Sequence, residues 1–243
     1  MKYITRFNPT IYTESLHCGH LYMALVNERE AHRSGGQFIV RIDDTQKYWR
    51  HKLGIELLDQ CHDEYYAQLH RFLVIDKWER QSNMPSIETI MDISPLENIV
   101  PKPRWFHDLI ADWVSDPDMA MYPYAPAFTF EKVIWDFYEG VNWLIRGEDL
   151  ATEVALYDFF ADVLGLPRMR QTLLPRLRAK NRGELGRTAV SKTLRNYNLS
   201  KQIDKFGTEG VLEYLKQSCL IDPEKEFYVE NIKWNPTVIG FEP

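Results

Sequence analysis

The residues best suited to chemistry stand near the start of the sequence, in the stretch "SLHCGHLYMAL" (residues 15–25). His17 and His20 are three positions apart where an apolar pattern with helical spacing begins, so they share one face of the first helical turn. Gly19, between them, has no side chain and lets a flat ring or a phosphate approach the backbone. A helix start presents free N–H groups and the positive end of the helix dipole. The stretch therefore predicts a site where two imidazoles donate to a triphosphate.

Two other interpretations of this stretch stay open. Two histidines near a helix start are an ordinary structural feature. If no other motif accompanied the pair, this structural interpretation would be preferred to a phosphate site. Metal binding by His17, Cys18 and His20 is weaker, because such tight spacing with no distant fourth ligand is poor zinc geometry. A second feature, Ser191 and Lys192, lies in the basic loop "AKNRGELGRTAVSKT", a type of loop that can close over phosphates. This serine–lysine pair becomes specific only in combination with the histidines.

The elements that position these residues begin with a strand, a helix and a second strand. "YITRFNP" predicts a buried strand, "HLYMALVNEREAHRSGG" a helix that ends at Gly35 and Gly36, and "QFIVRIDDT" another short strand. This βαβ unit implies a parallel sheet with a right-handed crossover. Ligands of such sheets bind at the carboxyl ends of the strands, which are the positions of Asn8, Thr10, Asp43 and Asp44.

The same scheme returns after an interruption. Residues 85–127 hold seven of the thirteen prolines and no glycine, which predicts an insertion across the sheet. A strand then runs to Ile145, followed by a polar corner at 146–149 and an amphipathic helix that ends at Gly165. Later in the chain, "QTLLPRLR" is a candidate strand and "TEGVLEYLKQSCL" a late helix.

Composition and charge narrow the class of protein. A chain of 243 residues with 44% hydrophobic residues can bury one sizeable core. It has no run of 18 apolar residues and no basic-then-apolar leader, so we expect neither a membrane span nor a signal peptide. Its three distant cysteines indicate reduced thiols and a cytoplasmic location.

The charge is unevenly distributed along the chain. The net charge of −6 argues against a general nucleic-acid coat. Residues 168–195, however, carry nine basic residues and one acid, so this segment is +8 and the rest of the chain is −14. A charge run is usually a solvated face, but an arginine-rich one favours phosphate, which indicates a nucleotide or polyanion partner.

Taken in order, these motifs resemble the catalytic domain of class I glutamyl-tRNA synthetases. The stretches that carry the resemblance are "TRFNPTIYTESLHCGHLYMAL", "RIDDT", "ERQSN", "WLIRGED" and "AVSKT". The resemblance implies an α/β fold: a Rossmann-like parallel sheet, a short inserted subdomain and a small C-terminal helical extension. We expect the catalytic core at 1–84 and 121–200, the inserted subdomain at 85–120 and the extension at 201–243.

The resemblance also implies a reaction. The enzyme would be a ligase that uses ATP and Mg²⁺ to activate glutamate, or a close acidic amino acid, as an adenylate. It would then pass the acyl group to tRNA or a tRNA nucleotide in protein biosynthesis. The implied ATP site comprises His17, Gly19, His20, Ser191 and Lys192, with His17, His20 and Lys192 catalytic and no metal held by the protein. The implied amino-acid site comprises Arg6, Asn8, Thr10, Asp43, Phe128, Lys132 and Arg146.

Roles within the amino-acid site follow from the charges of the substrate. Arg6 and Arg146 would meet carboxylates, and Asp43 would accept the α-ammonium. An ion pair of Arg146 with Glu148 or Asp149, which would hold the corner, is the structural alternative.

Three positions depart from the family pattern. A family tyrosine falls on Phe128, a family asparagine on Lys132 and a family alanine on Asn8. Losing a hydroxyl weakens discrimination, whereas an added cation strengthens the preference for a negative side chain. The pocket is therefore expected to hold glutamate differently or to hold another acid.

The acceptor is the least constrained part of the reaction. We expect a stand-alone form without the anticodon-binding domain, similar to glutamyl-queuosine tRNA(Asp) synthetase but without its zinc cluster. One alternative is a tRNA-independent ligase that acylates a small molecule, a peptide or a carrier protein. Another is a non-catalytic paralogue that binds a nucleotide.

Overall fold

The structure, a computed structural model, describes residues 1–11, 15–45, 55–86, 90, 126–175, 177 and 198–233. Within these ranges the side chains of residues 55–57 and 126–128 are not described. Ser191, Lys192 and most of the predicted insertion lie outside the described residues. The predicted domain boundaries therefore stay a prediction.

A five-stranded parallel sheet forms the centre of the fold, with strand order β3-β2-β1-β4-β5. The strands are β1 (Ile4–Phe7), β2 (Gln37–Ile42), β3 (Lys77–Arg80), β4 (Trp143–Gly147) and β5 (Arg170–Leu174). The chain builds outward from β1 to β3 and then, on the other side of β1, from β4 to β5. The strand order thus reverses between β1 and β4, the position where doubly wound sheets bind ligands beyond their carboxyl ends.

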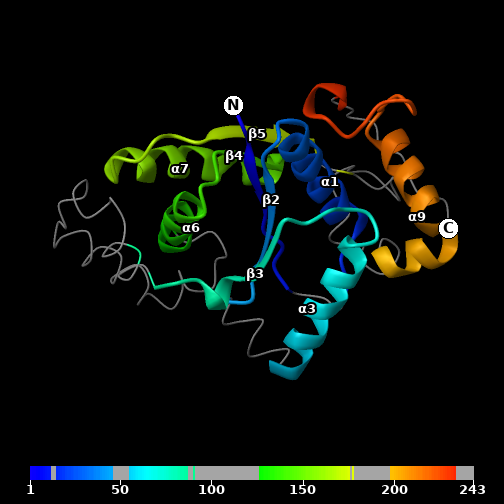
Figure 1. The fold of residues 1–243 in the computed structure, drawn as a ribbon, viewed down its shortest axis with the longest axis horizontal. Helices are drawn as coiled ribbons and strands as arrows, with labels where there is room; N and C mark the ends of the chain where they lie inside the picture. Colours follow the sequence, from blue (N-terminus) through cyan, green and yellow to red (C-terminus); the bar gives the residue numbers. More distant parts are fainter. Residues whose placement is uncertain are drawn as a thin grey trace, which may run out of the picture.

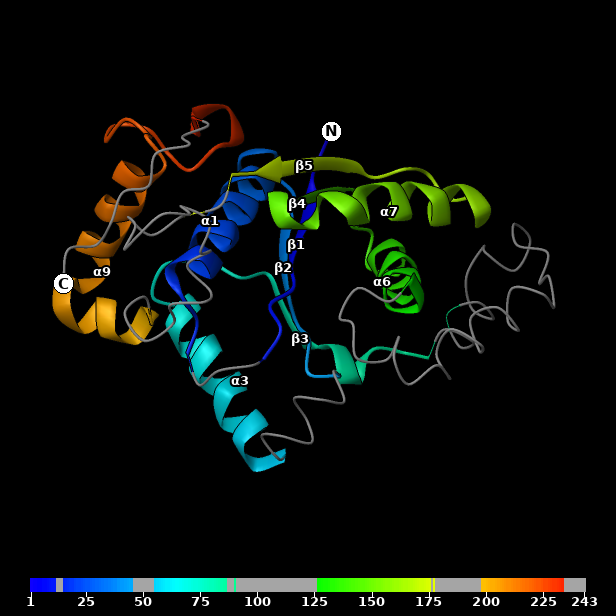
Figure 2. The same cartoon turned by 180° about the vertical axis from the view of Figure 1, so that it is seen from behind.

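Helices cover both faces of the sheet, with α6 (Pro126–Tyr138) and α7 (Ala151–Val163) on one side and α1 (Cys18–Arg33) and α9 (Leu199–Ser218) on the other (Figures 1 and 2). The helix α3 (Ile55–Leu69) lies on the side of α1. Alternate residues of a strand enter different cores, as expected from the two-residue period. Val40 and Ile145 join the core under α1, α3 and α9, whereas Ile39 and Leu144 join the core under α6 and α7.

Most of the predicted elements are confirmed. The parallel pairing of β1 with β2 confirms the βαβ unit, and β4, α7 and β5 fall where the sequence indicates them. The helix α1 ends at Arg33, and Gly35 follows with a φ of 70°, a conformation that favours glycine. The late helix α9 begins earlier than predicted, at Leu199, because the side chain of Asn198 caps it and Gly207 permits a kink within it.

Short 3-10 helices complete the described fold: η1 (Gln81–Asn83), η4 (Glu148–Leu150) and η6 (Val229–Asn231). The N–H of Val229 donates to Glu30 of α1 at 2.8 Å, which fastens the segment after α9 to the N-terminal part of the chain. Among the described helices, none is both long and apolar enough to cross a membrane. The three cysteines are free thiols and are buried.

Candidate active site

The helix α1 starts at the histidine pair. His17 is its N-cap residue, and Nδ1 of His17 accepts the backbone N–H of His20 at 3.2 Å. Because Nδ1 accepts, the ring proton of neutral His17 resides on Nε2. The first turn of α1 carries no acidic side chain, so the positive end of the helix is available to an anion.

Burial keeps both imidazoles neutral at physiological pH. Burial lowers the pKa of His17 to about 4, and burial followed by repulsion from His17 lowers the pKa of His20 well below its ordinary value. The two rings stack, with centroids 3.7 Å apart and planes at 19°. The ring of His20 also lies 6.0 Å from that of Phe7, between centroids, which places the pair at the carboxyl end of β1.

Cys18 and Gly19, the two residues between the histidines, lie in different surroundings. A Cβ atom at Gly19 would stand 2.9 Å from Cε1 of His17, so glycine leaves room for that ring. Cys18 is buried, and burial raises the pKa of its thiol to about 12. Among the described residues, no three His, Cys, Asp or Glu side chains gather where they could hold a metal ion.

Residues 198 and 199, late in the chain, pair with the segment that holds His17. His17 forms an antiparallel bridge with Asn198, and the N–H of Leu199 donates to the carbonyl of Leu16 at 2.7 Å. Asn198 also caps α9 by accepting the N–H of Lys201 at 3.1 Å. The start of α9 therefore pairs directly with the start of α1.

A buried glutamine fastens this junction. Nε2 of Gln68, on α3, donates to the hydroxyl of Ser15 at 2.8 Å and to that of Ser200 at 2.7 Å. Oε1 of Gln68 accepts the N–H of Leu16 at 2.9 Å. One amide thus connects the segment before the histidine pair with the first turn of α9.

Three buried arginines share one face of the sheet. Each follows an aliphatic residue by two positions, in Ile4-x-Arg6, Ile39-x-Arg41 and Leu144-x-Arg146. Because strand residues two apart point to the same face, the aliphatic residues face the core under α6 and α7, and the arginines lie beyond them toward the carboxyl edge. The hydrophobic core under α6 and α7 is therefore followed, toward the carboxyl edge of the sheet, by a layer of charged side chains, here called the ionic layer.

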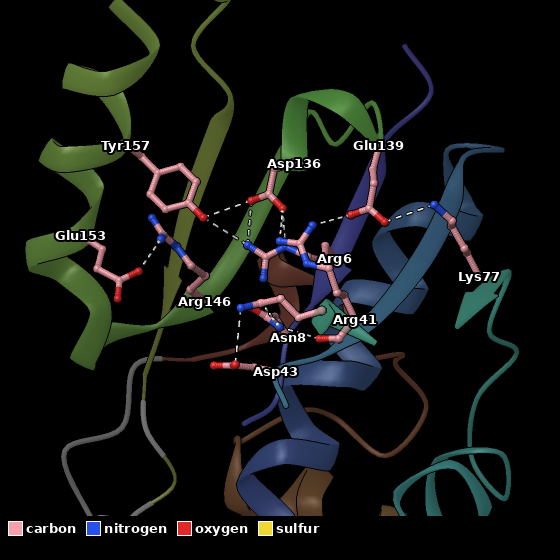
Figure 3. A network of polar contacts seen from close by, with 11 residues as sticks. Arg6, Asn8, Arg41, Asp43, Lys77, Asp136, Glu139, Arg146, Glu153 and Tyr157 are labelled. Atoms are coloured by element: carbon pink, nitrogen blue, oxygen red, sulfur yellow. Dashed lines mark hydrogen bonds and ion pairs between the residues drawn. The ribbon is translucent and has the colours of Figure 1, made fainter. Parts of the chain in front are cut away.

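Asp136 of α6 is the central anion of this layer (Figure 3). It accepts from Nη2 of Arg6 at 2.7 Å and from Nη2 of Arg41 at 2.7 Å. Nε of Arg6 lies 2.7 Å from Oδ1 of Asp136 as an ion-pair contact. The hydroxyl of Tyr157 donates to the same carboxylate at 3.0 Å. Burial by itself raises the pKa of Asp136, but the two arginines outweigh that effect and hold it below its ordinary range. The carboxylate is therefore ionised and committed to both guanidinium groups.

Arg146 has acceptors of its own within the protein. Its Nη1 donates to Glu153 of α7 at 3.2 Å, and its Nη2 donates to Oε1 of Gln171. Its guanidinium also lies 4.5 Å from the centroid of the Tyr157 ring. The ion pair at this corner is thus made with Glu153, one helical turn beyond the predicted partners Glu148 and Asp149.

Lys132 lies one turn before Asp136 on α6. Charged side chains from the strands and from α7 act on its ammonium group. Burial lowers the pKa of Lys132 to about 8, partly offset by attraction to Glu153 and Asp43. Arg6 and Arg41 lower it further. At neutral pH the side chain is still mostly an ammonium ion.

Asp43 lies at the carboxyl end of β2, where predicted. It accepts the hydroxyl of Thr10 at 3.1 Å and that of Thr45 at 3.1 Å. Asn8 donates to the backbone carbonyl of Arg41 and lies 3.4 Å from Oε1 of Gln81. Asn8 therefore ties β1 to β2 and η1, a structural bond at the corner where the sequence predicted a substrate contact.

The structure thus gathers most of the predicted site at one edge of the sheet. Arg6, Asn8, Thr10, Asp43, Lys132 and Arg146 lie there, beside His17, Gly19 and His20. Phe128 belongs to α6, but its side chain is not among the described residues. Of the basic segment, Arg168 pairs with Asp162, and Arg170 stacks 3.7 Å from the centroid of the Trp143 ring.

Sequence reasoning missed the carboxylates that partner the arginines. They are Asp136, Glu139 and Glu153, with the hydroxyl of Tyr157 between them. A signal was present in the run "FTFEKVIWDFYEG", where an acid interrupts an apolar helical face. The repeated aliphatic-x-Arg spacing in three strands was a second signal.

The sequence and the fold of the chain were compared with those of known proteins. Residues 2–60 match the family model described as tRNA synthetases class I (E and Q), catalytic domain. No curated protein matches the chain by sequence. Among solved structures, the glutamate-tRNA synthetase from Elizabethkingia anophelis is 16% identical with a TM-score of 0.52, over 85% of this chain and 54% of that chain.

Two further solved structures show the same likeness. The glutamate tRNA ligase from Elizabethkingia meningosepticum CCUG26117, in complex with its amino acid, is 16% identical with a TM-score of 0.50, over 79% of this chain and 53% of that one. The tyrosyl-tRNA synthetase from Archaeoglobus fulgidus, complexed with L-tyrosine, is 17% identical with a TM-score of 0.52, over 78% and 59%. The present chain spans somewhat more than half the length of each.

The fold of this chain is shared with the catalytic cores of class I aminoacyl-tRNA synthetases. The match over residues 2–60, which hold the first two motifs, confirms the resemblance to the catalytic domain of the class I (E and Q) tRNA synthetases.

Proposed function

We propose that the chain is a ligase that activates glutamate, or a close acidic amino acid, with ATP and passes the acyl group to tRNA or a tRNA nucleotide. The observation that carries the proposal is the pairing of His17 with Asn198. Asn198 follows Lys192 by six positions, so the residue that pairs with His17 is close in sequence to the serine–lysine pair. This proximity supports the proposal that the loop and the histidine pair act on one triphosphate.

The described residues suit ATP. The start of α1 offers backbone N–H groups and no acid in its first turn, and neutral His17 carries a proton on Nε2. These donors are fixed before the ligand arrives, as electrostatic stabilisation of developing charge requires. Ser191 and Lys192 would clamp the phosphates from the other side. Mg²⁺, carried on the phosphates, would neutralise charge on the leaving pyrophosphate.

Both steps of the proposed reaction need positioning and no protein nucleophile. A carboxylate oxygen of the amino acid attacks the α-phosphorus, the bond from that phosphorus to the bridging oxygen breaks, and pyrophosphate leaves. An acceptor hydroxyl then attacks the acyl carbon of the adenylate, AMP leaves, and the hydroxyl proton passes to solvent. Arg6 and Arg146 would orient the carboxylates and Asp43 the ammonium.

ATP–pyrophosphate exchange tests this function. The assay compares glutamate, aspartate, glutamine and tyrosine as substrates, each with and without bulk tRNA. Glutamate-dependent or aspartate-dependent exchange supports the proposal, and absence of exchange with all four contradicts it.

Filter binding tests the acceptor. Binding of tRNA that weakens steeply between low and moderate salt indicates phosphate contacts and supports transfer to RNA. Exchange without any RNA binding would instead favour a ligase that acylates a small molecule, a peptide or a carrier protein.

A further inference from the structure

The amino-acid site contains a carboxylate of its own at the position where a substrate carboxylate is expected. Glu153 is 3% exposed and accepts from Nη1 of Arg146 at 3.2 Å. Gln171 accepts from Nη2 of the same guanidinium, and the ring of Tyr157 covers it. The charge of Arg146 is therefore already matched by the protein.

An incoming carboxylate would place two negative charges on one arginine. In a buried site, such a like-charge pair is costly unless one of the two gains another cation. Glu153 has such a cation close by, because the ammonium of Lys132 is its electrostatic neighbour across the packed helices α6 and α7. Lys132 stands on α6 and Glu153 on α7, and these two helices pack against each other.

We propose, resting on the function given above, that Glu153 is a specificity-determining residue. It holds Arg146 while the amino-acid site is vacant and passes to Lys132 when a substrate carboxylate takes Arg146. The exchange conserves charge, because Glu153 moves from one cation to another and the substrate replaces it. Only a ligand with a carboxylate that competes for Arg146 completes the exchange.

The proposal assigns opposite effects to two substitutions. Glu153→Gln removes the competing charge, so the KM for the preferred acidic amino acid in pyrophosphate exchange is expected to fall about tenfold, with kcat changed less. Lys132→Met removes the alternative partner, so this KM is expected to rise about tenfold or more. The double variant Lys132→Met/Glu153→Gln should return KM to the wild-type value or below it, because no displaced carboxylate is left without a cation.

Matched controls separate this role from a structural one. Asp162→Asn makes the same charge change on the same helix, at a surface pair with Arg168, and should leave KM unchanged. A purely structural Glu153 that only orients Arg146 predicts the opposite sign, a higher KM in Glu153→Gln. If Glu153→Gln fails to fold, Glu153→Asp provides the test, since a shorter carboxylate is a weaker competitor and should lower KM.

The outcomes distinguish this inference from the proposed function. Calorimetry measures binding of the amino acid without turnover. A wild-type chain that binds none of the amino acids contradicts both proposals. A chain that binds glutamate, but whose double variant is as impaired as Lys132→Met, contradicts this inference alone and assigns Lys132 to direct contact with the substrate.

Discussion

Nδ1 of His17 accepts the backbone N–H of His20 at 3.2 Å, so this imidazole caps the helix α1 through the residue whose ring it stacks against. The rings stack with their centroids 3.7 Å apart. The cap determines the tautomer, because a nitrogen that accepts cannot carry the proton. The ring proton of neutral His17 is thereby on Nε2.

The proposed phosphate contact of His17 can be tested separately from its role as a helix cap. Asparagine caps helices well but has no atom at the position of Nε2. We expect His17→Asn to change the free energy of unfolding by less than about 1 kcal/mol and to lower pyrophosphate exchange by roughly 10²–10³, as expected for loss of a preorganised donor. Urea unfolding and initial rates measure the two effects. Unchanged exchange in this variant would exclude His17 from phosphate binding.

The buried histidine also predicts how stability depends on pH. Burial lowers the pKa of His17 from 6.5 to about 4, so between these values the unfolded chain binds a proton that the native chain does not. Stability is therefore lost as the pH falls from about 6.5 to 4, with a slope of up to about 1.4 kcal/mol per pH unit from this group. Urea unfolding at several pH values should show a smaller loss in His17→Asn than in the wild-type chain. Parallel curves would contradict this.

The serine–lysine loop is tested by Lys192→Ala. We expect ATP–pyrophosphate exchange to fall by roughly 10²–10³, since one positive donor to the phosphates is removed. Lys201→Ala, an exposed lysine in the first turn of α9, is the matched control and should retain normal exchange. Near-normal exchange in Lys192→Ala would remove the loop from the mechanism.

The ionic layer is tested by Asp136→Asn. The substitution leaves Arg6 and Arg41 without their shared carboxylate in a buried position. Breaking such a pair typically costs about 3–5 kcal/mol, and we expect that loss in the free energy of unfolding. Asp63→Asn is the control, because the side chain of Asp63 is 84% exposed and its loss should change stability by about 0.5 kcal/mol or less. Equal stability of the two variants would show that the layer contributes nothing.

The fold follows from the sequence to a large extent. The βαβ unit, the strand that ends at the Arg146 corner and the helix after it are all visible as hydrophobic periods bounded by glycines and polar turns. The positions of Thr10 and Asp43 follow as well, because the carboxyl ends of adjacent parallel strands meet at one edge.

The partners within the site do not follow from the sequence in the same way. Hydrophobic periodicity does not indicate which helix will cover a charged residue of a strand. Asp136 and Glu153 are therefore recognised as partners of the arginines only once α6 and α7 are placed over the sheet. Arg146 is an example: the structural alternative named Glu148 or Asp149, which are nearer in sequence, whereas the structure shows an ion pair with Glu153, which is buried on α7. The hydrogen bond from the side chain of Asn8 to the backbone carbonyl of Arg41 likewise follows only from the pairing of β1 with β2.

The division of charge between the two kinds of element has a consequence for how such a protein can diversify. Arg6, Arg41 and Arg146 are carried by strands whose removal would dismantle the sheet, whereas Asp136 and Glu153 are carried by two helices laid over it. Substitutions in the covering helices alone can therefore change how the same three guanidinium groups are paired, while the sheet that carries them stays unchanged.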